Sequence, residues 1–199
     1  LDIVNPFFRV RKLREEVEMA RELLPAFNRQ AILEGHMTPI WFGSAINSFE
    51  LDDTHTDGII HVSTGVLGCV TAFAEMLGNV SGRDFLTAVA LAYEVACRVA
   101  APVGMEIAHQ GWNNTGTCCP FGSTAGVGRM LGLSPEQMGH AMGIAGNWAG
   151  GLQAVQFASM AKRIVPSKSS EGAILGALLA QNGFTGIEDV FENKFGGFY

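Results

Sequence analysis

Carboxylates and imidazoles gather in residues 50–61, the part of this sequence best suited to chemistry. Within these twelve residues stand one Glu, three Asp and two His: Glu50, Asp52, Asp53, Asp57, His55 and His61. Only 16% of the chain is charged, so the segment stands out from its surroundings. Such side chains can transfer protons or hold a metal ion. The simpler alternative is an acidic loop whose Asp and Thr side chains cap the next helix. Because the His residues add nothing to a cap, we expect a chemical role.

A metal-dependent hydrolase is one interpretation of this segment. Five of its side chains have the right ligand types, namely Asp52, Asp53, His55, Asp57 and His61. Their spacing, however, matches no pattern of a known metal site. A phosphate-binding loop also fails, since Gly126-x-Gly128 lacks a third Gly at position 131 and no Gly-Lys-Ser/Thr occurs. We therefore expect neither a metal site nor a phosphate-binding loop.

The composition indicates one globular domain over residues 1–199. The hydrophobic fraction is 48%, the net charge is −6, and the mean hydropathy is +0.22. The acidic balance and the lack of a Lys/Arg run argue against nucleic acid as the main partner. The longest apolar stretch, residues 85–104, contains Glu94 and Arg98 four residues apart, which favours an amphipathic helix over a membrane span.

The four cysteines indicate a reducing compartment. Cys69, Cys97, Cys118 and Cys119 form no C-x-x-C pair, so a disulfide framework or a zinc site is not expected. Buried thiols that pack as small hydrophobic groups fit better. The first residues also lack a basic segment followed by an apolar one, so we expect no secretory signal and a cytoplasmic location.

Helical periodicity and capping residues run through most of the chain. We predict helices over residues 9–24, 64–77, 81–99, 121–131, 134–149, 169–182 and 187–193. The strongest start is Ser134-Pro135-Glu136-Gln137, in which Ser is the N-cap and Gln completes a capping box. Several Gly residues fall inside these patterns, where each costs about 1 kcal/mol, so we expect close packing of backbones. No strand ladder is apparent, and the predicted fold class is all-α.

Several ordered motifs resemble the MmgE/PrpD family over about residues 48–199. The family's Leu-Asp-x-Asp-Asp-Thr-His segment, followed by His-Pro-Gly, resembles residues 49–55 and then His61. Its Gly-Trp/Phe-His-x-Thr segment resembles residues 111–115, and its Lys-Arg-Leu-His-Pro-Gly segment resembles residues 162–167. The remaining matches are residues 131–137, 143–146, 183–186 and 196–198. Residues 1–47 form a divergent N-terminal part. The family includes 2-methylcitrate dehydratase, cis-aconitate decarboxylase and iminodisuccinate epimerase.

The resemblance implies a compact helical domain and cofactor-independent proton transfer beside the carboxylate of a small di- or tricarboxylate. It assigns His61 as the acid/base and places Asp53 and Thr54 in the same pocket. It also assigns Lys162 to the binding of a substrate carboxylate. These roles agree with the chemistry, because a carbanion beside a carboxylate needs facing positive groups and His titrates near neutral pH. The further candidates for substrate binding are Glu50, His55, Asn113, Thr115, Arg163 and Lys168. Of these, Lys168 stands before a predicted helix N-terminus, where an anion would be favoured.

Three positions depart from the family's motifs. Asn113 replaces a His and cannot shuttle a proton near pH 7, although it can orient a carboxylate. Val165 replaces another His, and Glu50 replaces the first Asp of the acidic segment. His109, four residues before Asn113, is a candidate substitute for the missing proton carrier; the simpler alternative is a helix-end His.

Family members are about twice this length and carry an α+β domain that completes their site. The resemblance therefore implies a fragment of a longer enzyme, a lyase or isomerase that self-associates, or a helical subunit without activity of its own that needs a partner chain. An unpartnered half of such a site is expected to expose an apolar face.

Overall fold

The computed structural model describes residues 38–48, 50–157 and 159–199, and this part of the chain is helical without a sheet. The α-helices are α2 (Thr38–Asn47), α3 (Val62–Leu77), α4 (Gly82–Ala100), α5 (Gly104–His109), α6 (Asn114–Leu131), α7 (Pro135–Ala145) and α8 (Val165–Gln181). Three short 3₁₀ turns join α7 to α8: η1 (Gly146–Trp148), η2 (Gln153–Phe157) and η3 (Met160–Arg163). The all-α prediction is confirmed for these residues. The predicted helix over 9–24 lies outside them. None of the helices described is long and apolar enough to cross a membrane.

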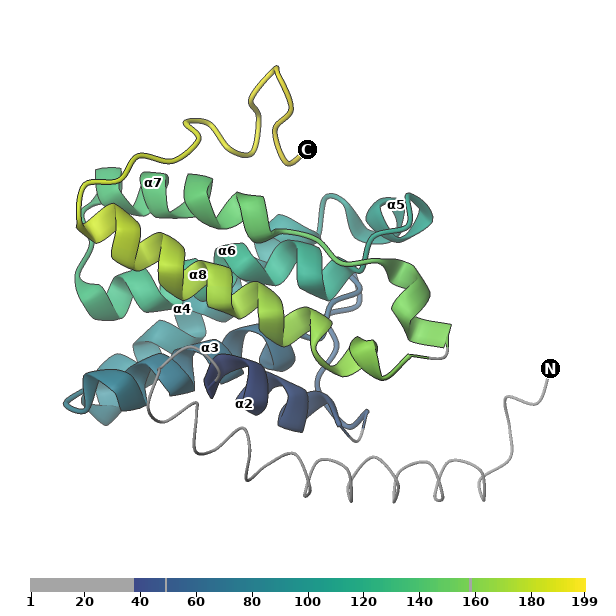
Figure 1. Ribbon diagram of the computed structural model, residues 1–199, viewed down its shortest axis with the longest axis horizontal. Helices are drawn as coiled ribbons and strands as arrows, with labels where there is room; N and C mark the ends of the chain where they lie inside the picture. Colours follow the sequence, from purple (N-terminus) through teal and green to yellow (C-terminus); the bar gives the residue numbers. More distant parts are fainter. Residues whose placement is uncertain (1–37, 49, 158) are drawn as a thin grey trace.

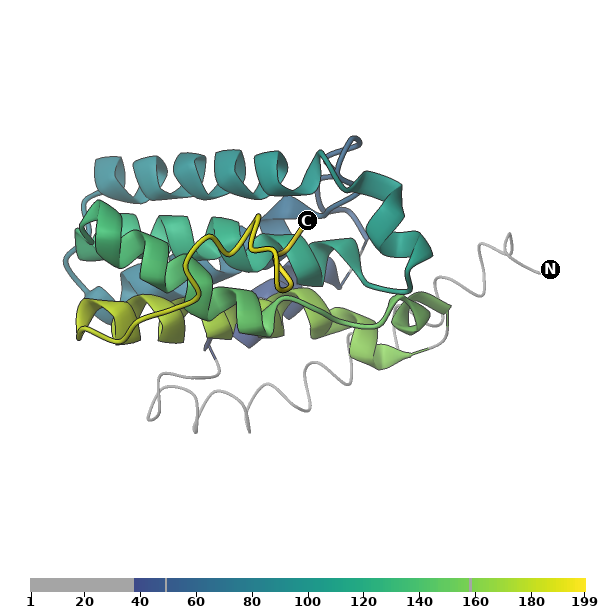
Figure 2. The ribbon, with the colours of Figure 1, turned by 90° about the horizontal axis from the view of Figure 1, so that it is seen from above.

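The longer helices run side by side along the molecule, and α6 lies at their centre (Figures 1 and 2). It packs against α3, α4, α7 and α8, and almost every residue from Asn114 to Gly128 is buried. The sequence of α6 explains this position, because its many small residues let neighbouring backbones approach. At Gly122, for example, the position of a Cβ is already taken by Ala92 O and Ala96 Cβ on α4. The prediction that helical glycines serve close packing is confirmed here.

Pro120 lies inside α6 and leaves one carbonyl of the helix without its usual donor. Pro has no N–H, so it cannot donate to the Gly116 carbonyl four residues earlier. That carbonyl instead accepts a hydrogen bond from the Gly150 N–H over 3.1 Å. The segment after α7 is thereby tied to the first turn of α6.

The caps predicted from the sequence are present. Ser81 Oγ accepts from the Asp84 N–H at the start of α4, and Ser134 and Gln137 form a capping box at the start of α7. Gly78 and Gly132 end α3 and α6 with φ of 72° and 67°, in the left-handed region that favours glycine.

Three predicted helix bounds are wrong. Helix α6 starts seven residues earlier than predicted, because Asn113 caps it; α8 starts four residues earlier, because Pro166 fits a first turn, where no N–H partner is lost. Helix α7 ends at Ala145 and not at residue 149 as predicted, and the 3₁₀ turn η1 follows it.

Residues 187–193 form turns and not the predicted helix. Asp189 adopts a φ of 53°, which interrupts a right-handed helix. The turns carry Phe191 and Phe198 onto Phe121 of α6, with ring centroids 4.8 and 5.0 Å from the Phe121 ring. The C-terminal segment, which runs past α7 in Figure 1, therefore contacts α6 through aromatic rings.

Candidate active site

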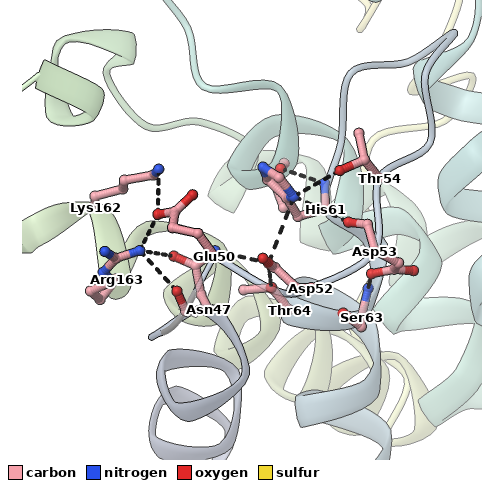
Figure 3. A network of polar contacts seen from close by, with 11 residues as sticks. Asn47, Glu50, Asp52, Asp53, Thr54, His61, Ser63, Thr64, Lys162 and Arg163 are labelled. Carbon is pink, nitrogen blue, oxygen red and sulfur yellow. Dashed lines mark hydrogen bonds and ion pairs between the residues drawn. The ribbon is translucent and has the colours of Figure 1, made fainter. Parts of the chain in front are cut away.

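The acidic segment forms the connection between α2 and α3, at one end of the bundle. A β-bridge between His55 and Ile60 closes a turn, inside which His55 Nδ1 accepts from the Gly58 N–H over 3.1 Å. Asp53 Oδ1 accepts from the Ser63 N–H in the first turn of α3 over 2.9 Å. Part of the segment thus serves turn formation and capping, the simpler of the two interpretations. The side chains of Asp52 and Thr54 instead approach His61, the residue before α3 (Figure 3).

His61 is held from both its backbone and its ring. Its N–H donates to Thr115 Oγ1 on α6 over 3.0 Å, while its Nδ1 lies 3.1 Å from the Asp53 carbonyl oxygen and 3.3 Å from Thr54 Oγ1. A carbonyl oxygen can only accept, so the contact with Asp53 requires the proton on Nδ1. The neutral ring then carries its lone pair on Nε2. No described residue forms a hydrogen bond with Nε2, and 31% of the His61 side chain is exposed.

Asp52 lies behind His61 and is fully buried. Its Oδ2 is 3.7 Å from His61 Nδ1, and the Asp52 side chain has 0% exposure. The same oxygen accepts from Asn47 Nδ2 over 2.9 Å and from Thr64 Oγ1. Oδ1 is also buried and has no hydrogen-bond partner among the described residues. Nothing in the sequence ranked Asp52 above its acidic neighbours.

Lys162 and Arg163 form a cationic pair at the end of η3, and both contact Glu50. Lys162 Nζ donates to Glu50 Oε1 over 2.6 Å, and Arg163 donates to the same oxygen through NH1. Partial burial acts to raise the pKa of the Glu50 carboxyl, but the hydrogen bonds and charges of Lys162 and Arg163 hold it below its usual value. The last turn of η3 thus brings both cations to the same carboxylate oxygen.

Asn47, the last residue of α2, joins the cations to the buried carboxylate. Its backbone carbonyl and its Oδ1 accept from Arg163 NH1 over 2.8 and 3.2 Å, and its Nδ2 donates to Asp52. One network thus connects side chains from α2, the acidic loop and η3, in the order Lys162, Glu50, Arg163, Asn47, Asp52 and His61 (Figure 3).

A comparison with known families and proteins identifies the family of this chain. The model of the MmgE/PrpD N-terminal domain matches residues 36–199. The chain belongs to the MmgE/PrpD family. The cis-aconitate decarboxylase-like protein oryM of Aspergillus oryzae is 36% identical over 163 residues, which are 78% of this chain and 34% of that protein. The cis-aconitate decarboxylase of Aspergillus terreus is 33% identical over 161 residues, which are 77% of this chain and 32% of the relative.

The chain thus spans about a third of the length of these relatives. A separate match to peptide chain release factor 3 of Bordetella petrii is 50% identical, but it extends over only 38 residues, 7% of that protein. The family model also begins earlier than the resemblance seen from the motifs, at residue 36 rather than 48.

Asn113, which replaces a His of the MmgE/PrpD motif, has a structural role in this family member. It is buried and caps α6, where its Oδ1 accepts from the Gly116 N–H over 2.9 Å. That oxygen is therefore engaged in the helix cap. Asn114, which the sequence analysis did not single out, is buried beside it and donates to the Gly58 and Gly104 carbonyls. The two neighbours fix the start of α6 against the acidic loop.

The remaining candidates lie apart from the network or support it indirectly. Thr115 is buried and binds the His61 backbone, while the His55 ring is used within its own turn. Lys168 lies inside α8 and not before a helix N-terminus as predicted; it is exposed and forms no side-chain hydrogen bond or ion pair with a described residue. His109 is exposed in the last turn of α5, which fits the simpler interpretation of a helix-end His.

The structure gives no support to the metal-hydrolase interpretation, since no three His, Cys, Asp or Glu of the described residues are grouped to hold a metal ion. The four cysteines are free thiols. Burial raises the pKa of the Cys69 and Cys118 thiols to about 12, so both stay protonated near neutral pH.

Proposed function

We propose that this chain carries the proton-transfer and carboxylate-binding residues of a lyase that acts on a small di- or tricarboxylate, such as cis-aconitate. The observation that carries the proposal is the continuous network between Lys162 and His61. It sets an imidazole and a pair of cations into one site. The two relatives are a cis-aconitate decarboxylase and a protein similar to one, which favours decarboxylation. Dehydration and epimerisation are the alternatives from the same family.

His61 is the proton carrier in this proposal. Its Nδ1 proton is directed to the Asp53 carbonyl, so Nε2 can accept a proton from a substrate carbon or, once protonated, return one. The imidazolium formed during the reaction is stabilised by the buried Asp52 carboxylate 3.7 Å away. Asp52 acts through His61 and is a positioning residue.

Lys162 and Arg163 are the carboxylate-binding residues. Both side chains are largely buried, with 19% and 21% exposure, and a cation that is partly removed from water attracts an anion more strongly than an exposed one. Two cations facing one carboxylate of the substrate can also stabilise negative charge that develops on the neighbouring carbon. No metal and no cofactor is needed for this chemistry.

The test is proton NMR in D2O of the purified chain with a panel of carboxylates that includes cis-aconitate and 2-methylcitrate. Loss of carbon dioxide, alkene formation and deuterium exchange at a stereocentre are distinguishable in these spectra. We expect conversion by the native chain and none by His61→Ala. A reaction that proceeds equally in His61→Ala would refute the assignment.

A second candidate function is a helical subunit that completes its site with another polypeptide or a second copy. The exposed apolar side chains near the network favour it: Leu51 beside Glu50 is 88% exposed, and Phe157 before η3 is 82% exposed. Large apolar surfaces of this kind are typical of interfaces. This candidate predicts that the purified chain is inactive on the whole panel and still binds a tricarboxylate. The free thiols are compatible with a cytoplasmic location for either candidate.

A further inference from the structure

We propose that Glu50 is an internal occupant of the carboxylate-binding position formed by Lys162 and Arg163, and that a substrate carboxylate must displace it. The inference rests on the proposed function and changes the role of one residue within it. The sequence analysis placed Glu50 among the substrate-binding residues. Its carboxylate, however, repels a second carboxylate and occupies the cations that would bind one.

The geometry of the contact is that of a replaceable ligand of the two cations and not of an ion pair that uses both carboxylate oxygens. Lys162 and Arg163 both donate to a single oxygen, Oε1, and Oε2 accepts from no described residue. A carboxylate that binds an arginine and a lysine most strongly uses both of its oxygens.

Glu50 is more exposed to solvent than the two cations that it contacts. Its side chain is 41% exposed, about twice the exposure of Lys162 and Arg163. Partly exposed ion pairs contribute little to stability, so the Glu50 contact can be exchanged at small cost. In the view of Figure 3 the Glu50 carboxylate lies between the two cations and His61, where a substrate that reaches both would sit.

The backbone at Glu50 is also suited to a residue that moves. Its φ is 54°, in the left-handed region that non-glycine residues rarely adopt. Such a conformation persists where surrounding contacts hold it, and here the contacts are those to Lys162 and Arg163. The next side chain, Leu51, is 88% exposed and provides no packing that would resist a rearrangement.

Glu50 is therefore a specificity-determining residue. A weak monocarboxylate gains little by replacing an anion that is already tethered at the site. A substrate with several carboxylates gains contacts at more than one position and can displace it. The consequence is a lower affinity for every anion and a stronger preference for polycarboxylates.

The test is isothermal titration calorimetry of the full chain with tricarballylate, a saturated tricarboxylate, with acetate for comparison. Glu50→Gln keeps the shape and removes the charge, and it should bind tricarballylate about three- to tenfold more tightly than the native chain. Its gain for acetate should be the larger of the two, because acetate competes with Glu50 least well. Glu188→Gln, an exposed position on the C-terminal segment, is the matched control and should leave both affinities unchanged.

Glu50→Asp provides a second variant, since its shorter side chain keeps the charge but loses reach to the cations. Its affinity is expected to fall between those of the native chain and Glu50→Gln, with circular dichroism as the check on folding. Unchanged or weaker binding by folded Glu50→Gln, or no binding by any of the chains, would overturn the inference. Turnover is not measured, so failure of the catalytic assignment at His61 remains a separate result.

Discussion

The side-chain amide of Asn47 donates a hydrogen bond to Asp52 Oδ2 over 2.9 Å. The same amide accepts from Arg163 through its oxygen. One residue at the end of α2 therefore connects the cationic side of the site to the carboxylate behind His61. The two functions of the site, binding of an anion and transfer of a proton, are held in a fixed relation by this single buried side chain.

Asn47→Ala should lower both stability and activity. Asp52 would keep the hydrogen bond from Thr64 but lose the one from Asn47, and Arg163 would lose one acceptor, so a loss of about 0.5–1.5 kcal/mol per hydrogen bond is expected. Urea denaturation and turnover measured on the same preparation provide the check. Asn79→Ala, an exposed position after α3, serves as the control and should match the native chain in both. Equal stability of the two variants would show that the Asn47 bridge contributes nothing.

Asp52→Asn should reduce kcat with little change in KM. The substitution removes the negative charge 3.7 Å from His61 Nδ1 and so destabilises the imidazolium that forms during the reaction. A loss of roughly ten- to hundredfold in kcat is expected, less than the 10²–10⁴-fold that an acid–base group itself contributes, because Asp52 acts through His61. Lys162→Ala provides the contrast, since loss of a carboxylate-binding cation should appear mainly in KM. A native kcat in Asp52→Asn would contradict the role of Asp52 as a positioning residue for His61.

Acid should weaken the contribution of Glu50 to stability. Because its pKa is lowered in the folded chain, the carboxyl stabilises the fold above its ordinary value of 4.5, and that contribution is lost as the pH falls through the folded value. Native chain and Glu50→Gln should therefore differ most in their free energy of unfolding at neutral pH and converge below pH 4.5. Glu188→Gln, which lacks an ion pair among the described residues, should follow the native curve at every pH. A constant difference across the range would contradict the ion pair.

Two glycines test whether close helix packing builds the bundle. Gly122→Ala places a Cβ 2.6 Å from Ala96 Cβ, and overpacking of this kind should destabilise the fold by about 1–3 kcal/mol. Gly139→Ala on α7 meets no atom within 4 Å and should stabilise the helix by about 0.5–1 kcal/mol. Midpoints of urea unfolding separate the two directions. Effects of the same sign would argue against the α4–α6 contact.

Local patterns were sufficient to predict much of the fold. The caps at Ser81 and Ser134 and the glycine ends at positions 78 and 132 depend on residues close in sequence, so periodicity and cap chemistry locate α3, α4 and α7 to within a few residues, apart from the C-terminal end of α7. The start of α6 was missed, because Asn113 was considered for its chemistry and not as an N-cap.

The site was predictable only in part. His61 and its acidic neighbours stand out by density in the sequence, whereas Lys162 lies 112 residues from Glu50 and was identified only through the family resemblance. Asn47 and Asp52 could not be ranked, since their role depends on burial and on which face of the loop turns inward. Neither burial nor the orientation of the loop can be inferred from the spacing of residues along the chain.

The most direct test of the central claim is the rate of cis-aconitate conversion by the native chain, His61→Ala and His109→Ala, followed by NMR under identical conditions. His109 is exposed at the end of α5 and is the matched control. The account predicts conversion by the native chain, a loss of about 10²–10⁴-fold in His61→Ala, and a native rate in His109→Ala. Conversion that survives in His61→Ala, or that depends instead on His109, would contradict the assignment of His61 as the proton carrier.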